Sequence, residues 1–525
     1  MSMQVRHSRA EIGRFDHLKS EFSRNGSFIF AGHLLKRAAT KFADRPALIA
    51  DEGVVSYKKL YERATAVTLA LTQMGVKAGD RVCVLFENSV DFYIAYYGAW
   101  QTGAVVAPLN TYLHEKELDH IISDAQPKAL LAGTQLADKI KLIARELPPL
   151  ISADQMAQFP SPSDDQLKNL EIPERAEDEI AVLLYTSGTT GVPKGVMLST
   201  KCILTNIMQG LAILDVHPED RVFGVLPFFH SFAQFACVWG NLVVGASVII
   251  VPKIDRKYIL HGLSHKPTAV LGVPAMYGLF CLMRTIDFSS VRYFVSGGDA
   301  MPDKIRTGFE IIYRRKISNG YGMTETSPLI AINFDEELCD PNTVGRPAIG
   351  IDCSIRDGEN NEVPYGKKGL LWVKGGNVML GYYNAPEQTA AVMQDGWLNT
   401  GDCAYFDDQG RLVIFGRERD IIKNKGLIIY PQEIENIIMG HPAVIKVAVV
   451  GKKDEAIGEI PVAFIALKEK VADIEKQLKE LCGRNLAPYK IPRKFIVMDD
   501  LPMTALGKID KKKLRAELAN HTIRD

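Results

Sequence analysis

The sequence predicts an α/β protein with a large N-terminal domain of layered α/β subdomains and a smaller α+β domain at the C-terminus. Short β-rich runs at residues 81–86, 104–108 and 248–251 alternate with segments of helical period at 58–74 and 91–100. This alternation favours layers built on largely parallel sheets. A chain of 525 residues is long enough for roughly two to four packing units.

Changes in composition along the chain mark its subdomains. Residues 159–178 are rich in Pro, Ser and Asp and are expected to be coil before a buried strand at 180–185. From residue 370 to 414, short runs with Gly, Asn and Asp turns predict a small antiparallel β unit. Beyond it we expect helix 431–439, strands 445–450 and 462–467, and helix 471–481. We therefore divide the chain into domains of 1–417 and 418–525.

Charge and cysteine content limit which partners and which cellular compartment the sequence indicates. The 62 Lys and Arg residues balance the 62 Asp and Glu residues, so no overall charge indicates nucleic acid or an anionic membrane as a partner. Eight cysteines are scattered singly, without zinc-type spacing, which is typical of reduced and mostly buried thiols in a cytoplasmic protein. The charged N-terminal stretch predicts no secretory signal.

The longest apolar run, residues 235–252, approaches the length of a membrane span. Glycine and asparagine interrupt it, and it ends in the strand-like sequence VIIV. We expect a buried helix, a turn and a strand here, and no transmembrane segment. Peripheral contact with a membrane stays open, and the sequence does not predict an oligomeric state.

A loop after the predicted strand at 180–185 combines hydroxyl residues, glycines and a lysine. Glycines let backbone N–H groups turn toward an anion, hydroxyls add donors, and a lysine supplies a movable cation. This composition suits a polyphosphate, although Gly, Ser and Thr clusters are usually plain turns. A Walker loop is disfavoured, because that motif needs Ser or Thr where Gly195 follows Lys194. The candidate phosphate-binding residues are Thr186, Ser187, Gly188, Thr189, Thr190, Gly191 and Lys194.

The stretch YTSGTTGVPKG at 185–195 resembles the AMP-binding signature of the adenylate-forming (ANL) superfamily, which includes acyl-CoA synthetases, firefly luciferases and peptide-synthetase adenylation domains. Five further motifs of that family follow in the family's order, together with its hinge. They are LPFFHSF at 226–232, VSGGDAMP at 295–302, NGYGMTET at 319–326, NTGD at 399–402, the hinge GRERDIIKNKGLIIYPQEIE at 416–435 and PMTALGKIDKKKLR at 502–515. The resemblance covers residues 185–515, and together the motifs are specific.

The resemblance implies that the protein binds ATP and Mg²⁺. It makes Glu325 and Thr186 the metal-binding residues, although an isolated loop glutamate would otherwise be a solvated surface charge. It places Tyr321 on the adenine and assigns Asp402 to the ribose, because a carboxylate can accept two hydrogen bonds from a diol. Besides the loop, the implied ATP- and AMP-binding residues are Gly297, Gly298, Asp299, Asn319, Gly320, Tyr321, Gly322, Thr324, Asp402, Ile414, Arg417 and Lys508.

The same resemblance implies an acyl pocket around the aromatic motif. His230 lies in sequence among phenylalanines, where a histidine is usually a satisfied core residue, but the motif makes it a guide for the substrate carboxylate. So apolar a cluster suits an aliphatic or aromatic acyl group and disfavours a charged one. The implied pocket residues are Phe229, His230, Phe232, Ala300, Gly322 and Met323.

For the C-terminal domain, the resemblance implies a mobile catalytic role. Lys508 matches the family's adenylation lysine, whose ammonium neutralises charge between the carboxylate and the α-phosphate. In the family this domain rotates on a hinge, here near Arg419, and presents the face around Lys423, with Lys425 and Gly426 on the coenzyme A side. Two positions depart from the commonest pattern. Arg419 stands where Asp or Lys is usual, and Asn399 replaces an arginine that often precedes TGD.

The function that these motifs imply is an ATP-dependent acid–thiol ligase. It would convert a carboxylic acid to acyl-AMP with release of pyrophosphate and then transfer the acyl group to coenzyme A. Residues 227–234 and 395–402 look most like medium- or long-chain fatty acyl-CoA ligases. We expect coenzyme A as the acceptor, because we expect no attached carrier domain after Arg515. An aryl-acid CoA ligase and a stand-alone ligase that loads acyl-carrier protein stay open. A luciferase-like oxygenase and a catalytically inactive adenylate-binding scaffold are remote alternatives, the latter disfavoured because Lys508, Glu325 and Asp402 are all present.

Overall fold

The computed structural model describes residues 7–143, 146–187, 193–334, 343–424, 427–454, 458–503 and 509–520. Contacts divide the chain into two compact units. The larger comprises Met1–Met301, Gly308–Cys353 and Val373–Leu398, and the smaller comprises Pro302–Thr307, Ser354–Trp372 and Asn399–Asp525. This grouping follows compactness, and the functional division at residue 417 stays a prediction.

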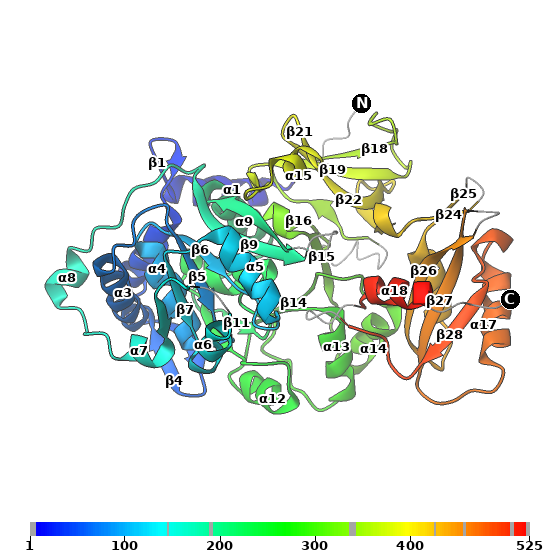
Figure 1. Ribbon diagram of the computed structural model, residues 1–525, viewed down its shortest axis with the longest axis horizontal. Coiled ribbons are helices and arrows are strands. Elements are labelled where there is room, and N and C mark those ends of the chain that lie inside the picture. The colour runs from blue at the N-terminus through cyan, green and yellow to red at the C-terminus, as the bar shows by residue number, and fades with distance from the viewer. Residues whose placement is uncertain are drawn as a thin grey trace. The chain divides into compact units, whose positions relative to one another are not determined.

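The larger unit contains two large sheets with helices packed on them (Figure 1). The first has the order β20-β10-β9-β6-β5-β7-β8, in which β9 and β10 are antiparallel and β9, β6, β5, β7 and β8 are parallel. Its strands are β5 (Arg81–Leu85), β6 (Val105–Pro108), β7 (Ala129–Ala132), β8 (Leu150–Ser152), β9 (Ile180–Ser187), β10 (Pro193–Ser199) and β20 (Gly381–Tyr382). Strands β5, β6 and β7 are buried almost throughout, as the apolar runs predict.

The second sheet has the order β17-β16-β15-β14-β13-β11-β12-β3-β4. Its strands from β15 to β3 are parallel to one another, and β16 and β4 are antiparallel to β15 and β3. The strands are β3 (Pro46–Ala50), β4 (Gly53–Ser56), β11 (Arg221–Gly224), β12 (Ser247–Ile250), β13 (Ala269–Gly272), β14 (Tyr293–Ser296), β15 (Ser318–Gly322), β16 (Leu329–Ile332) and β17 (Arg346–Pro347). The parallel α/β layers that the sequence predicts are confirmed.

The predicted helices in this unit are also present. Helix α3 (Tyr57–Gln73) begins after Ser56, whose hydroxyl accepts the N–H of Lys59, and α4 (Val90–Gln101) begins after Ser89 in the same way. The predicted coil at 159–178 is interrupted by one short helix, α8 (Asp164–Lys168). Ser163 and Gln166 form a capping box at its start, a local signal that the composition of the segment obscures.

The apolar run at 235–252 forms a helix, a turn and a strand, as predicted. A π-helix (Gln234–Trp239) leads into α11 (Gly240–Val244), the chain turns at Gly245 with φ of 78°, and β12 follows. Buried tyrosines of α4 satisfy carbonyl groups here, since Tyr93 Oη donates to Cys237 O at 3.0 Å and Tyr97 Oη to Val238 O at 2.6 Å. No described helix is long and apolar enough to cross a membrane.

The predicted small β unit is present as a sheet of order β18-β19-β22-β21, with β23 paired to β22, but residues 381–382 of the predicted range belong instead to the seven-stranded sheet, where β20 pairs with β10. Its strands are β18 (Ile351–Arg356), β19 (Gly369–Gly375), β21 (Met393–Gln394), β22 (Trp397–Phe406) and β23 (Leu412–Arg417). Strands β22 and β23 are antiparallel and place Asp402 opposite Arg417. This hairpin lies mainly in the smaller unit.

The rest of the smaller unit is a five-stranded sheet with both faces covered. Its strands are β24 (Ile422–Asn424), β25 (Leu427–Ile429), β26 (Val444–Asp454), β27 (Gly458–Leu467) and β28 (Lys494–Met498). On one face, Val447 and Val449 share a core with α16 (Pro431–Met439) and α17 (Ile474–Asn485). On the other, Ala448 and Val450 share a core with α18 (Lys511–Asn520). The predicted α+β pattern is confirmed, and α17 begins and ends slightly later than predicted.

Candidate active site

Three motifs that are distant in sequence follow parallel strands of the nine-stranded sheet at the same edge. The aromatic motif follows β11, the Gly297–Gly298 turn follows β14, and the turn at Thr324 follows β15. The carboxyl ends of parallel strands lie at one edge of a sheet, where open α/β folds bind their ligands. The topology therefore gathers residues predicted for the acyl pocket, the adenine and the phosphates.

The predicted phosphate loop joins β9 to β10 as a hairpin, in which Thr186 lies opposite Lys194 and Ser187 opposite Pro193. Side chains of helix α5 (Glu115–Ala125) contact both strands. Tyr185 Oη donates to Asp124 Oδ2 at 2.7 Å, and the His120 ring nitrogen lies 3.3 Å from Pro193 O. Burial, and then Asp124, raises the pKa of Tyr185, so its phenol stays a donor. The tip of the loop, with Gly188, Thr189, Thr190 and Gly191, lies outside the described residues.

Glu325, the predicted metal ligand, lies in a short 3-10 helix (Thr324–Thr326) and is 9% exposed. Tyr382 Oη donates a hydrogen bond of 2.9 Å to Glu325 Oε1. The Lys194 ammonium lies 4.9 Å from the centre of the Tyr382 ring. The structure thus connects Lys194 and Glu325 through a tyrosine that was not among the predicted site residues. The signal available for Tyr382 is the GYYN stretch, which the sequence pattern places only in the predicted small β unit of residues 370–414.

Two contacts connect the predicted acyl-pocket motif with the nucleotide motifs. Ser231 Oγ lies 3.1 Å from Thr324 Oγ1. A Cβ at Gly297 would lie 3.2 Å from the Phe232 ring, so the aromatic side chain packs against that glycine. Ser231, like Tyr382, was not predicted as a site residue. His230 caps the short helix α10 (Ser231–Ala233), because its ring nitrogen Nδ1 accepts the N–H of Phe232.

The remaining predicted pocket residues differ in environment. Phe229 is half-buried, with its ring 6.3 Å from that of exposed Tyr112, whereas Phe228 is fully buried against Phe92 and Tyr93. Asp299 and Ala300 are exposed, and the Asp299 carboxylate accepts the N–H of Ala300. Asn319, Gly320, Tyr321, Gly322 and Met323 are half-buried in and just after β15.

Gly322 is a position where only glycine fits. A Cβ there would lie 1.8 Å from Pro328 O, far inside van der Waals contact. The close approach lets Met323 N–H donate to that same carbonyl at 3.0 Å. The turn carrying Thr324 and Glu325 is consequently tight, and its shape depends on the absent side chain.

In the smaller unit, Asp402 and Arg417 form an ion pair, with Arg417 Nε 3.0 Å from Asp402 Oδ1. The Asp402 side chain is 6% exposed and that of Arg417 48%. Asn399 stands where the family often has arginine. Its Oδ1 accepts a hydrogen bond from the backbone N–H of Gly401 at 2.9 Å. Gly401 has φ of 68°, so this asparagine stabilises the turn that presents Asp402. Ile414 lies in β23 opposite Ala404.

The predicted hinge forms a 3-10 helix, Glu418–Asp420, tied to the last helix of the chain. Arg515 of α18 donates to Asp420 Oδ1. Burial, and next the charge of Arg417, lowers the pKa of Arg419. Lys423 is exposed, and its backbone N–H donates to Glu459 Oε2 at 3.0 Å. Lys425, Gly426 and Lys508 lie outside the described residues.

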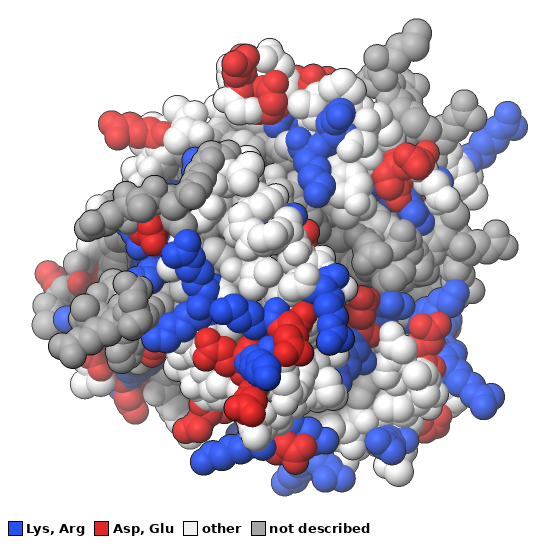
Figure 2. All heavy atoms as spheres, turned by 90° about the vertical axis from the view of Figure 1, so that its right-hand side faces the viewer, with Lys and Arg blue, Asp and Glu red and all other residues white. Residues whose placement is uncertain are grey.

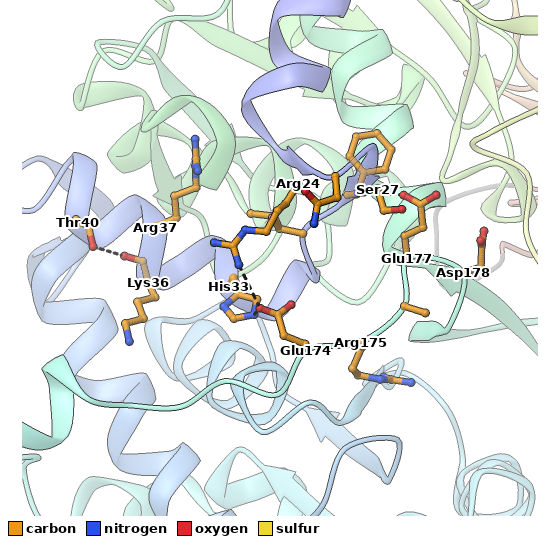
Figure 3. A pocket seen from close by; sticks show the side chains of 14 residues that line it. Arg24, Ser27, His33, Lys36, Arg37, Thr40, Glu174, Arg175, Glu177 and Asp178 are labelled. Carbon is orange, nitrogen blue, oxygen red and sulfur yellow. Dashed lines mark hydrogen bonds and ion pairs between the residues drawn. The ribbon is translucent and has the colours of Figure 1, made fainter.

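A cavity of about 710 Å³ lies elsewhere in the larger unit (Figure 3). It is lined by the N-terminal segment and by residues 174–178, and none of the predicted site residues lines it. Its charged groups already have protein partners. Lys36 Nζ donates to Leu170 O at 2.8 Å, Arg37 pairs with Glu21 at 3.0 Å, and Arg175 is bonded to Glu179 at 2.8 Å. The first contact joins an early helix to the segment 159–178, the second joins two early helices, and the third lies within a single segment, so the three do not converge on one point.

The described residues contain no group of three or more His, Cys, Asp or Glu side chains able to hold a metal ion. A magnesium ion needs no such cage, because one or two carboxylates and substrate phosphates usually complete its site. The buried carboxylate of Glu325 beside the phosphate-loop hairpin fits that donor set. The face shown in Figure 2 has no extended patch of one charge that would indicate a different kind of ligand, because its Lys and Arg side chains are interspersed with Asp and Glu.

Comparisons with protein-family models and with known proteins agree with the family that the sequence motifs resemble. The family model of the AMP-binding enzymes matches residues 35–383, and that of the AMP-binding enzyme C-terminal domain matches residues 433–508. A long-chain-fatty-acid–CoA ligase of Bacillus subtilis is 34% identical, over 94% of this chain and 95% of its own. A long-chain-fatty-acid–CoA ligase of Escherichia coli is 30% identical, over 92% of this chain and 94% of its own.

Solved structures of similar proteins share the architecture. The anthranilate CoA ligase AuaEII in complex with anthranoyl-AMP has a TM-score of 0.85 and 27% identity, covering 93% of this chain and 97% of that one. The o-succinylbenzoate CoA synthetase of Bacillus subtilis in complex with ATP and magnesium ion has a TM-score of 0.84 and 28% identity, covering 92% and 99%. The similarity extends over nearly the whole length of both proteins.

Proposed function

The chain belongs to the AMP-binding enzyme family, and from this premise we propose that it is an AMP-forming acyl-CoA synthetase that activates fatty acids. The observation that carries the proposal is the 34% identity to a long-chain-fatty-acid–CoA ligase over 94% of the chain. At that coverage the similarity includes every motif from the phosphate loop to the hinge. The medium- or long-chain acyl group is the finer part of the proposal.

In the first half-reaction, a carboxylate oxygen of the acid attacks the α-phosphorus of ATP. The new C–O–P linkage forms as the bond to the β-phosphate oxygen breaks, and pyrophosphate leaves. Both reactants are anions, so catalysis requires positioning and charge neutralisation. In the larger unit we assign the phosphates to the β9–β10 hairpin with Lys194, and the adenine to Tyr321 and Asn319.

In the smaller unit, we assign the ribose to Asp402, assisted by Arg417, and charge neutralisation at the α-phosphate to Lys508. The Asp402–Arg417 pair supports the first assignment, because the guanidinium orients the carboxylate that would accept hydrogen bonds from the diol. For the metal, we assign Glu325 and Thr186. Mg²⁺, when bound, would neutralise phosphate charge and hold the triphosphate in place.

In the second half-reaction, the sulfur of coenzyme A loses its proton to solvent and bonds to the acyl carbon, while the C–O bond to AMP breaks and AMP leaves with its negative charge. We propose that the C-terminal domain turns about Arg419 between the two steps, withdrawing Lys508 and presenting Lys423. The curated relatives are named as CoA ligases, which supports coenzyme A over a carrier protein. The acceptor assay described below must exclude transfer of the acyl group to an acyl-carrier protein.

An aryl acid is the second candidate substrate. The structure of the anthranilate CoA ligase, at a TM-score of 0.85, supports it, as does the half-buried Phe229 ring. The apolar motif suits both acyl types, so the choice depends on the shape of the pocket. The fatty acid is preferred over the aryl acid because the Bacillus subtilis and Escherichia coli fatty-acid ligases are 34% and 30% identical, against 27% for the anthranilate ligase.

The proposal is tested by ATP–pyrophosphate exchange with a panel of acids, followed by comparison of coenzyme A and acyl-carrier protein as acceptors. We expect exchange to rise with medium- or long-chain acids and thioester to form with coenzyme A. Exchange with aryl acids only would select the second candidate. Loss of exchange with every acid, despite intact folding, would indicate an inactive adenylate-binding protein and overturn the proposal. A cytoplasmic location is part of the proposal, supported by the seven free cysteines among the described residues.

A further inference from the structure

We propose that Tyr382 is a positioning residue that orients Glu325, and with it the metal-bound phosphate end of the site. This inference rests on the proposed function and adds a residue to it. Tyr382 Oη donates to Glu325 Oε1 at 2.9 Å, and the two residues are 8% and 9% exposed. A hydrogen bond to one oxygen of a carboxylate in so buried a place restricts how that carboxylate can rotate.

The same side chain also supports Lys194 through the face of its ring. The ammonium lies 4.9 Å from the ring centre, within the range of a cation–π interaction. Lys194 and Glu325 come from segments more than a hundred residues apart. One tyrosine therefore sets the relative position of the cation and the carboxylate that would approach the same phosphates.

Backbone contacts on both sides hold Tyr382 in place. It lies opposite Val196 in β10, and the next residue, Tyr383, donates its N–H to Gly195 O at 2.7 Å. On the other side, Met379 N–H donates to Glu325 O at 2.8 Å. The segment 379–383 thus joins the phosphate-loop hairpin to the turn that carries Glu325. Movement of either would strain the other.

The chemistry of the phenol suits this task. Burial, and next the charge of Glu325, raises the pKa of Tyr382 well above its ordinary value. The phenol has one hydrogen, which it donates to the Glu325 carboxylate.

The test measures how much Mg²⁺ strengthens ATP binding, a quantity independent of turnover. Isothermal titration gives the Kd for ATP of each variant in Mg²⁺ and in EDTA. The quantity compared is the Kd in EDTA divided by the Kd in Mg²⁺. In Tyr382→Phe, which keeps the ring under Lys194, we expect this ratio to fall about tenfold. Tyr313→Phe is the matched control, because its hydroxyl donates to Phe280 O and Met283 O and touches none of the predicted site residues. It should leave the ratio unchanged.

The double variant decides whether Tyr382 acts through Glu325. If it does, Glu325→Gln combined with Tyr382→Phe should have the same ratio as Glu325→Gln alone. An unchanged ratio in folded Tyr382→Phe, or fully additive effects, would overturn the inference. Failure of the wild-type protein to bind ATP in a Mg²⁺-dependent way would instead overturn the proposed function. Thermal melting of each variant verifies that it is folded. Tyr382→Leu should weaken ATP binding more than Tyr382→Phe does, because it also removes the ring beneath Lys194.

Discussion

Asp402 and Arg417 lie directly opposite each other on β22 and β23, and their side chains form an ion pair of 3.0 Å. The cross-strand register brings together two residues of separate motifs, NTGD and GRERD. The Asp402 carboxylate is almost fully buried, so its orientation depends on the few groups that surround it.

Replacing Asp402 by asparagine should weaken ATP binding. Hydrogen bonds that involve a charged group contribute about 1.5–3 kcal/mol, so the KM for ATP should rise about 10- to 100-fold in exchange assays. Asp407→Asn is the matched control, because Asp407 pairs with Arg411 at 2.6 Å on the same hairpin. An equal rise in KM for both variants would show that the effect is structural and would contradict the ribose role.

Gly322→Ala should disrupt the Thr324–Glu325 turn. The added Cβ would lie 1.8 Å from Pro328 O, and a backbone atom cannot swing aside. We expect a loss of at least about 1–3 kcal/mol in the free energy of unfolding, together with loss of exchange activity. Gly13→Ala, in open space on α1 (Arg9–Glu21), should instead raise stability by about 0.5–1 kcal/mol. Denaturant unfolding of the two variants gives the comparison, and equal stabilities would contradict the close approach.

Lys508→Ala should separate the two half-reactions. Removal of one charge-stabilising group should reduce ATP–pyrophosphate exchange about 10²- to 10³-fold. Thioester formation from preformed acyl adenylate and coenzyme A should continue, because the ammonium acts only while the α-phosphate is attacked. Single-turnover assays of each step measure this division. Equal loss of both steps would refute it.

Asp420→Asn should destabilise the attachment of α18 in a pH-dependent way. Burial alone would raise the pKa of Asp420, but the hydrogen bond from Arg515 and nearby positive charges outweigh it and lower the pKa. The carboxylate therefore stabilises the folded state fully above the pKa of an unfolded aspartate, about 3.9, and this contribution is lost as pH falls through the lower folded-state pKa. The Tm difference between wild type and variant should be constant near neutrality and shrink below about pH 4. A difference that grew with acidity would contradict this sign.

Tyr93→Phe should destabilise the π-helix next to the aromatic motif. It removes the donor to Cys237 O inside a fully buried cluster, and an unsatisfied buried carbonyl costs about 1–3 kcal/mol. Thermal unfolding should show the loss. Tyr112→Phe, at a ring that is 57% exposed, should change stability by less than about 0.5 kcal/mol. Similar losses in both variants would contradict the role of Tyr93 as a donor to the π-helix.

Much of the fold was predictable from local patterns. Helix α16 has the predicted bounds because Pro431 stands at its first turn and apolar residues recur with helical period. Helix α8 was missed because its capping box lies in a segment whose composition indicates coil. Strand β26 runs to Asp454, beyond its predicted end at residue 450, because pairing with β27 orders a charged stretch that alone would read as loop.

The sequence by itself determined the family, the chemistry and most candidate residues, because motifs such as NGYGMTET place reactive groups at fixed local spacing. Only the tertiary structure decided which side chains support them. The hydrogen bond from Tyr382 to Glu325 joins residues 57 positions apart, and the contact between Ser231 and Thr324 spans 93. The second contact arises because β11 and β15 end at the same edge of one sheet, whereas the first joins β20 of the seven-stranded sheet to the turn that follows β15 of the nine-stranded sheet. Such contacts leave no periodicity in the sequence, because each partner is a single side chain whose neighbours are set by the closure of the whole fold.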